Sequence, residues 1–173
     1  MNKMSGRVLC AIVVSLVACG CGRTSERTAA LDPASQSLLY VSPDATNVRR
    51  AAEYDGTVSF DVADPYPAGV TIGLLEDAMK AKGWEPTTVD PLTGTERNGT
   101  RVWSSTYERS GERLDQWTGV WRRSSGEWVS YFVRFRTREP DVQARVAHVI
   151  GILMKARTVE RLRAAVAAGP PQN

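Results

Sequence analysis

Hydrophobic and polar residues alternate strictly along positions 57–62, and this period of two predicts a β-strand with one buried face. A second stretch of strand-forming residues, 48–54, precedes it. The pair Asp55-Gly56 between the two stretches accepts the positive φ angles of a two-residue type I′ turn. We therefore predict a β-hairpin over residues 48–62.

A helical pattern follows over residues 68–82. Hydrophobic side chains recur there every three or four positions, at Ile72, Leu75 and Met79. Gly83 is suited to the left-handed residue that ends a helix, and Trp84 can then pack back against Met79. Residues 85–100 are polar and rich in turn-forming pairs, so we predict a long loop with room for one short strand.

Three further strands are predicted at residues 101–108, 113–123 and 127–138, which form a meander. From Pro140 to Val166, hydrophobic residues recur every three or four positions, which predicts one long amphipathic helix or two shorter ones. The order of hairpin, helix, meander and helix predicts the α+β class. We expect an antiparallel sheet of about five strands with two helices packed on one face.

The first 18 residues have the composition of an export signal. Lys3 and Arg7 precede an apolar run from Val8 to Ala18. This run has 11 residues, whereas a helix that spans a membrane needs roughly 20. A basic stretch followed by a short apolar stretch is typical of a cleavable signal peptide.

The end of that run, Leu16-Val17-Ala18-Cys19, resembles the lipobox of bacterial lipoproteins. The resemblance implies that the Cys19 thiol carries a diacylglyceryl group, that the signal is removed before it, and that the new amine is acylated, as with palmitate. Several acyl chains anchor a protein stably, because each buried CH₂ contributes about 0.8 kcal/mol. We expect an exported protein, lipid-anchored to the cell membrane, or to the outer membrane if the host has two. The alternatives are an uncleaved anchor and an ordinary secretory signal.

The chain after the signal peptide (1–18) divides into three parts. Residues 19–37 are expected to be a lipidated N-terminus and flexible tether, because they are small and polar without a hydrophobic period. Residues 38–168 are expected to form a single α+β domain, and residues 169–173 a disordered tail. With segments such as Gly83-Trp84, this domain loosely resembles uncharacterised bacterial envelope lipoproteins, which implies no known activity.

The composition argues against an enzyme. The chain of 173 residues has one histidine and three cysteines. A zinc site needs several such ligands, and a catalytic histidine needs both an acid and a nucleophile beside it. His148 lies within the last predicted helix, and we interpret it as a structural or surface residue. The acidic pairs that a hydrolase would need are Asp61 with Asp64, Glu76 with Asp77, and Glu53 with Asp55. We expect no catalytic residue, metal or cofactor.

The last predicted hairpin offers a candidate binding face. If it closes tightly at Ser125-Gly126, one face combines aromatic and basic side chains: Trp117, Trp121, Arg123, Trp128, Phe132 and Arg134. Tryptophan rings stack on sugars and peptides, and arginine binds carboxylates and phosphates. The alternative is that these rings pack beneath the helices, and a one-residue slip in register would exchange the two faces.

Charge is distributed unevenly along the chain. Residues 31–100 carry eleven acids and five bases, a balance of −6, and residues 116–173 carry ten bases and four acids, a balance of +6. This asymmetry favours orientation on an anionic surface or pairing with a second copy. We expect a non-enzymatic interaction module that binds an envelope protein or another envelope component. Glycan or small-ligand binding through the Trp/Arg face is the alternative, with a hydrolase less favoured. Nucleic acid is not an expected partner of an exported protein.

Overall fold

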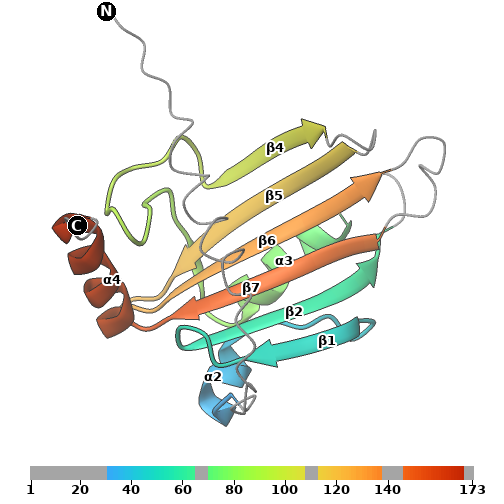
Figure 1. The fold of residues 1–173 in the computed structure, drawn as a ribbon. Coiled ribbons are helices and arrows are strands. Elements are labelled where there is room, and N and C mark those ends of the chain that lie inside the picture. The colour runs from blue at the N-terminus through green and yellow to red at the C-terminus, as the bar shows by residue number, and fades with distance from the viewer. Residues whose placement is uncertain (1–30, 65–69, 108–112, 138–145, 170–173) are drawn as a thin grey trace, which may run out of the picture.

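The computed structural model of the chain describes residues 31–64, 70–107, 113–137 and 146–169. These residues form one antiparallel sheet of seven strands together with three helices, so the predicted α+β class is confirmed, with seven strands in place of about five (Figure 1). The helices are α2 (Pro33–Leu38), α3 (Val70–Ala81) and α4 (Ala156–Ala168). The strands are β1 (Thr46–Ala51), β2 (Gly56–Ala63), β3 (Glu85–Pro86), β4 (Arg101–Tyr107), β5 (Arg113–Arg122), β6 (Trp128–Thr137) and β7 (Val146–Met154).

The strand order places the last strand of the chain in the middle of the sheet. Across the sheet the order is β1-β2-β7-β6-β5, and the far edge of β5 pairs with both β4 and the short β3. Strands β4, β5, β6 and β7 therefore form a meander that is one strand longer than predicted. Because β7 also pairs with β2, it joins the β1–β2 hairpin to the meander in one sheet.

Residues 146–154 form β7, so the helix predicted from Pro140 is wrong for this segment, and α4 begins only at Ala156. The side chains of β7 that are buried towards α3 are Ala147, Val149 and Leu153. Hydrophobic side chains also occupy its other face, because the run reads VAHVIGILM. A central strand that is apolar on both faces hides the period of two, and its spacing then imitates a helix.

The two long helices pack on opposite faces of the sheet, whereas the sequence predicted both on one face. Helix α3 covers the first face, where its buried side chains join the main core: Ile72, Leu75 and Met79. Helix α4 lies at one end of the second face (Figure 1), where Val159 belongs to a smaller cluster with Val120, Trp128 and Met154. Met154 is the last residue of β7, so the chain passes directly onto this second face as α4 begins.

The predicted end of α3 is confirmed. Gly83 adopts a left-handed φ of 75°, and the Trp84 N–H donates a hydrogen bond to the carbonyl oxygen of Met79 over 3.0 Å. Trp84 is buried in the main core together with Met79. This closing bond and hydrophobic contact are those of a Schellman motif.

The connection between β1 and β2 differs from the predicted two-residue turn. Four residues, 52–55, join the two strands, and Tyr54 takes a left-handed φ of 59°. The Asp55 N–H donates to the carbonyl of Leu153 over 3.2 Å, and the Asp55 carboxylate accepts from the Lys155 N–H over 2.6 Å. These contacts with the end of β7 hold the longer loop and override the local preference for a tight turn.

The segment before β1 is fastened to the sheet. Leu31 and Leu39 are buried, and the Leu31 side chain lies over Gly56, where a Cβ would come within 2.4 Å of it. The hydroxyl of Tyr131 accepts a hydrogen bond from the Tyr40 N–H over 2.6 Å and donates one to the Tyr40 carbonyl over 3.1 Å. The main chain at Tyr40 is thereby attached to β6 in the sheet interior.

The folded part of the chain begins no later than Leu31, within the segment 19–37 that was predicted as tether. The predicted signal peptide and Cys19 lie in residues 1–30, and most of the predicted tail lies in residues 170–173, all outside the described residues. Among the described helices, none has the length and apolar character needed to cross a membrane.

Candidate functional site

Strands β5 and β6 pair one residue away from the predicted register. Trp121 lies opposite Val129 and Trp117 lies opposite Val133. Five residues, 123–127, connect the two strands, and Gly126 among them adopts a left-handed φ of 91°. Because of this one-residue difference, the β6 side chains that were predicted to share a face with Trp117 and Trp121 lie on the other face of the sheet.

The tryptophans of the predicted binding face therefore do not share one surface. Trp117 and Trp121 face α3 in the main core and are only 1% and 3% exposed. Trp128 lies on the second face, in the cluster beneath α4. Arg123 lies in the hairpin connection, where its guanidinium sits 4.9 Å from the centre of the Trp84 ring, a cation–π contact.

The other two predicted residues, Phe132 and Arg134, lie on the part of the second face that α4 leaves uncovered, and both are partly exposed. Strand pairing aligns polar residues there in a row across five strands: Asp61, His148, Arg134, Gln116 and Ser104. We call this row, with Phe132 and Ile150 beside it, the open face. It lies on the side of the sheet away from α3 (Figure 1).

Two side-chain hydrogen bonds run along the row of the open face. His148 Nδ1 and Asp61 Oδ1 are 2.7 Å apart, and Arg134 Nε donates to Gln116 Oε1 over 2.9 Å. The His148 side chain is 47% exposed, so solvent reaches the imidazole. Burial lowers the pKa of the Arg134 guanidinium, and the positive charge of the neighbouring Arg136 lowers it further.

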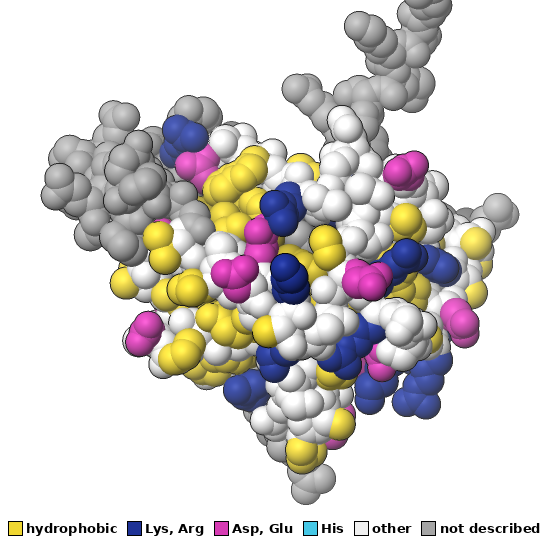
Figure 2. Space-filling view, turned by 180° about the vertical axis from the view of Figure 1, so that it is seen from behind, with side chains coloured by type: hydrophobic (Ala, Val, Ile, Leu, Met, Phe, Trp, Pro, Cys, Tyr) yellow, Lys and Arg dark blue, Asp and Glu magenta, His cyan; other side chains and the backbone are white. Residues whose placement is uncertain are grey.

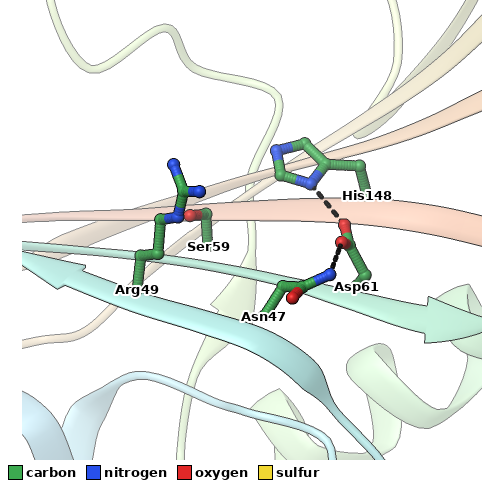
Figure 3. Close-up of a pocket in the computed structure, with 5 residues that line it drawn as sticks. All are labelled: Asn47, Arg49, Ser59, Asp61 and His148. Carbon is green, nitrogen blue, oxygen red and sulfur yellow. Dashed lines mark hydrogen bonds and ion pairs between the residues drawn. The ribbon is translucent and has the colours of Figure 1, made fainter.

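A polar cleft of about 340 Å³ lies at the β1 end of the open face, lined by Asn47, Arg49, Ser59, Asp61 and His148 (Figure 3). A β-bulge shapes it, because the pairing of β1 with β2 shifts between Thr46 and Arg49. Asn47 takes a left-handed φ of 53° within this bulge, and its side-chain amide donates to Asp61 Oδ2 over 2.8 Å.

The carboxylate of Asp61 organises the cleft. Hydrogen bonds from His148 and then Asn47 lower the pKa of Asp61, so it stays ionised well into the acid range. An ionised carboxylate can only accept, and therefore His148 Nδ1 carries the proton between them. Figure 3 shows the imidazole edge opposite this bond turned towards the side of the cleft where Arg49 and Ser59 lie.

Sequence reasoning missed the contact between Asp61 and His148 because it placed His148 on a helix. The pairing of Asp61 with His148 spans 87 positions and depends on β7 lying between β2 and β6. The sequence did contain one indication of this contact. Asp61 lies on the polar side of the alternating stretch 57–62, so its carboxylate was expected to face solvent beside the strand that pairs with β2.

Asp64 and Glu76, two of the acidic residues considered for a hydrolase, each bind a partner within the fold. Asp64 is fully buried and accepts from the Thr71 N–H at the start of α3 over 3.1 Å, whereas Asp61 lies on the open face. Glu76 forms an ion pair of 2.6 Å with Arg101. Within the described residues, no three His, Cys, Asp or Glu side chains come together as a metal site would require.

The chain matches no protein-family model, and neither the curated proteins nor the solved structures include a match to it.

Proposed function

We propose that this protein is an exported, lipid-anchored, non-enzymatic binding module of the bacterial cell envelope, which contacts its ligand through the open face. The leader sequence supports export and lipid attachment at Cys19. The observation that carries the binding role is the open face itself: an aromatic residue, Phe132, and the polar row of Asp61, His148 and Arg134 stand on a rigid sheet and stay accessible.

A hydrolase is the second candidate, supported by the Asp61–His148 pair. An acid bonded to Nδ1 of a histidine is the arrangement that orients a general base. Ser59 lines the same cleft, but among the described residues it makes no hydrogen bond to the imidazole. Binding is therefore the better-supported role, and hydrolysis of ester substrates that disappears in Ser59→Ala would reverse this order.

Mass spectrometry of the mature N-terminus tests the anchoring. We expect Cys19 as the first residue, bearing a diacylglyceryl thioether and an acylated amine. A Cys19→Ala variant should not mature and should lose its membrane attachment, because no other side chain at that position forms the thioether. An unmodified wild-type protein recovered in the soluble fraction would overturn this part of the proposal.

Binding to isolated envelope fractions tests the open face. The double variant Phe132→Ser/Arg134→Gln should lose at least about tenfold in affinity, because aromatic and arginine contacts dominate binding energy where they are central. Leu74→Ser is the matched control, since Leu74 is 52% exposed on α3, on the opposite side of the sheet. That side shows hydrophobic side chains mixed with acidic and basic ones (Figure 2). Equal losses in both variants would contradict a role for the open face.

A further inference from the structure

We infer that the cleft between Arg49 and His148 binds an oxyanion group, a sulfate or phosphate, and that it does so when the imidazole is protonated. This inference rests on the proposed function, because it names the ligand chemistry of one end of the open face. The cleft offers an exposed guanidinium, an imidazole and the hydroxyl of Ser59 around one space (Figure 3). Guanidinium and imidazolium groups are the strong donors for such oxygens.

The hydrogen bond to Asp61 decides how the imidazole meets a ligand. Because Nδ1 keeps its proton for the Asp61 carboxylate at 2.7 Å, a neutral His148 presents the lone pair of Nε2 to the cleft. A lone pair repels an anionic oxygen. Protonation puts a hydrogen on Nε2 and adds a positive charge, so the ring becomes a donor aimed to the same side as Arg49.

The charges around His148 come from each strand beside it. Asp61 on β2 is the negative neighbour, and Arg134 faces His148 directly from β6. Arg136 follows on β6, and Arg49 lies across the cleft on β1. An anion in the cleft would meet the positive charges of Arg49 and of a protonated imidazole, with Asp61 as the one acidic side chain in the lining.

Asp61 is the one acidic side chain that lines the cleft, and it binds Nδ1, on the edge of the imidazole away from Nε2. Both of its oxygens accept hydrogen bonds, Oδ1 from His148 and Oδ2 from Asn47. Among the described residues, by contrast, Arg49 has no ion-pair partner at salt-bridge distance. The cleft volume of about 340 Å³ falls at the lower end of the range for small-molecule sites, which suits the charged group of a larger ligand.

Titration with sodium sulfate tests the inference, because sulfate keeps its charge over the pH range used. His148 is the only histidine in the chain, so its ring signals in an NMR spectrum need no assignment by mutation. We expect sulfate to shift these signals at about pH 5.5, where the imidazole is protonated, and much less at about pH 8.5, where it is neutral. Its apparent affinity should fall about tenfold per pH unit once the imidazole has lost its proton.

Variants distinguish specific binding in the cleft from nonspecific attraction of sulfate to a positively charged surface. Arg49→Gln should abolish the sulfate response, and His148→Gln should leave weak binding without pH dependence, measured by calorimetry. Arg122→Gln is the matched control, since it removes one exposed arginine at the other end of the sheet. Equal loss in Arg122→Gln, or ring signals that do not respond to sulfate at about pH 5.5, would overturn the inference.

Two competitors identify where the oxyanion comes from. Displacement of sulfate by phosphatidylglycerol vesicles, and not by phosphatidylcholine vesicles, would assign the group to a lipid headgroup; displacement by inorganic phosphate alone would assign it to a soluble ligand. If Phe132→Ser/Arg134→Gln weakens envelope binding while sulfate has no effect, only this inference fails. If sulfate binds as expected but the envelope fraction does not need the open face, the proposed function fails instead.

Discussion

The hydroxyl of Tyr131 is a titratable group in the interior of the protein, and its surroundings oppose its ionisation. The side chain is fully buried, and this burial raises the pKa of the phenol well above its ordinary value near 10. Because folding raises this pKa, the phenol ionises at a lower pH in the unfolded chain than in the folded protein. The folded protein therefore loses stability as the pH rises from the unfolded pKa to the folded pKa.

We therefore predict that alkali destabilises the protein through Tyr131. The free energy of unfolding in urea should fall as the pH rises above about 10 in the wild type, and less steeply in Tyr131→Phe. At neutral pH, Tyr131→Phe should cost about 1–3 kcal/mol, because the buried polar groups of Tyr40 lose their partner. Identical slopes above about pH 10 in the two proteins would contradict the prediction.

At the scale of elements, a glycine in β5 allows two tryptophans to pack over it. A Cβ at Gly119 would lie 2.5 Å from the Trp121 ring and 2.6 Å from the Trp117 ring. We predict that Gly119→Ala destabilises the fold by about 1–3 kcal/mol, since the rings must move within a packed core.

A glycine in α3 provides a control for which the expected change in stability has the opposite sign. A Cβ at Gly73 meets nothing within 4 Å, so Gly73→Ala should stabilise the protein by up to about 1 kcal/mol through its helix propensity. Both changes are read from the midpoint of urea unfolding. A stable Gly119→Ala protein would mean that the two rings can repack without cost.

Elements with one buried face were predictable from the sequence, and those with two were not. Strand β2 and helix α3 show their periods because one side of each faces the core and the other faces solvent. Strand β7 carries apolar residues on both sides, so its pattern fitted a helix equally well. The register of β5 with β6 depended on one loop residue, Gly126, whose conformation the sequence left open.

The candidate site was predictable only in part for the same reason. Phe132 and Arg134 were identified from their own hairpin, although the correct register separates them from the tryptophans. The cleft depends on contacts between β1, β2 and β7, which are distant in the sequence. Local patterns carry no information about such contacts, and His148 was consequently interpreted without its partner Asp61.

At the scale of the whole molecule, the two faces of the sheet differ in how much of each is covered by a helix. The first face is covered by α3 and holds the main core. The second face is covered by α4 at one end only, which leaves the row of Asp61, His148 and Arg134 accessible. This arrangement explains why a chain with only one histidine can still concentrate polar groups at one place: strand pairing brings together residues contributed singly by different strands.

The double hydrogen bond between Tyr40 and Tyr131 also sets how the domain bears mechanical load. A pull on the chain ahead of Leu31 reaches Tyr40 before it reaches β1. The force therefore passes into β6, in the interior of the sheet, and edge strand β1 is not the first element to peel away. Because β1 contributes Asn47 and Arg49 to the cleft, we expect the cleft to survive any pull that these two hydrogen bonds withstand.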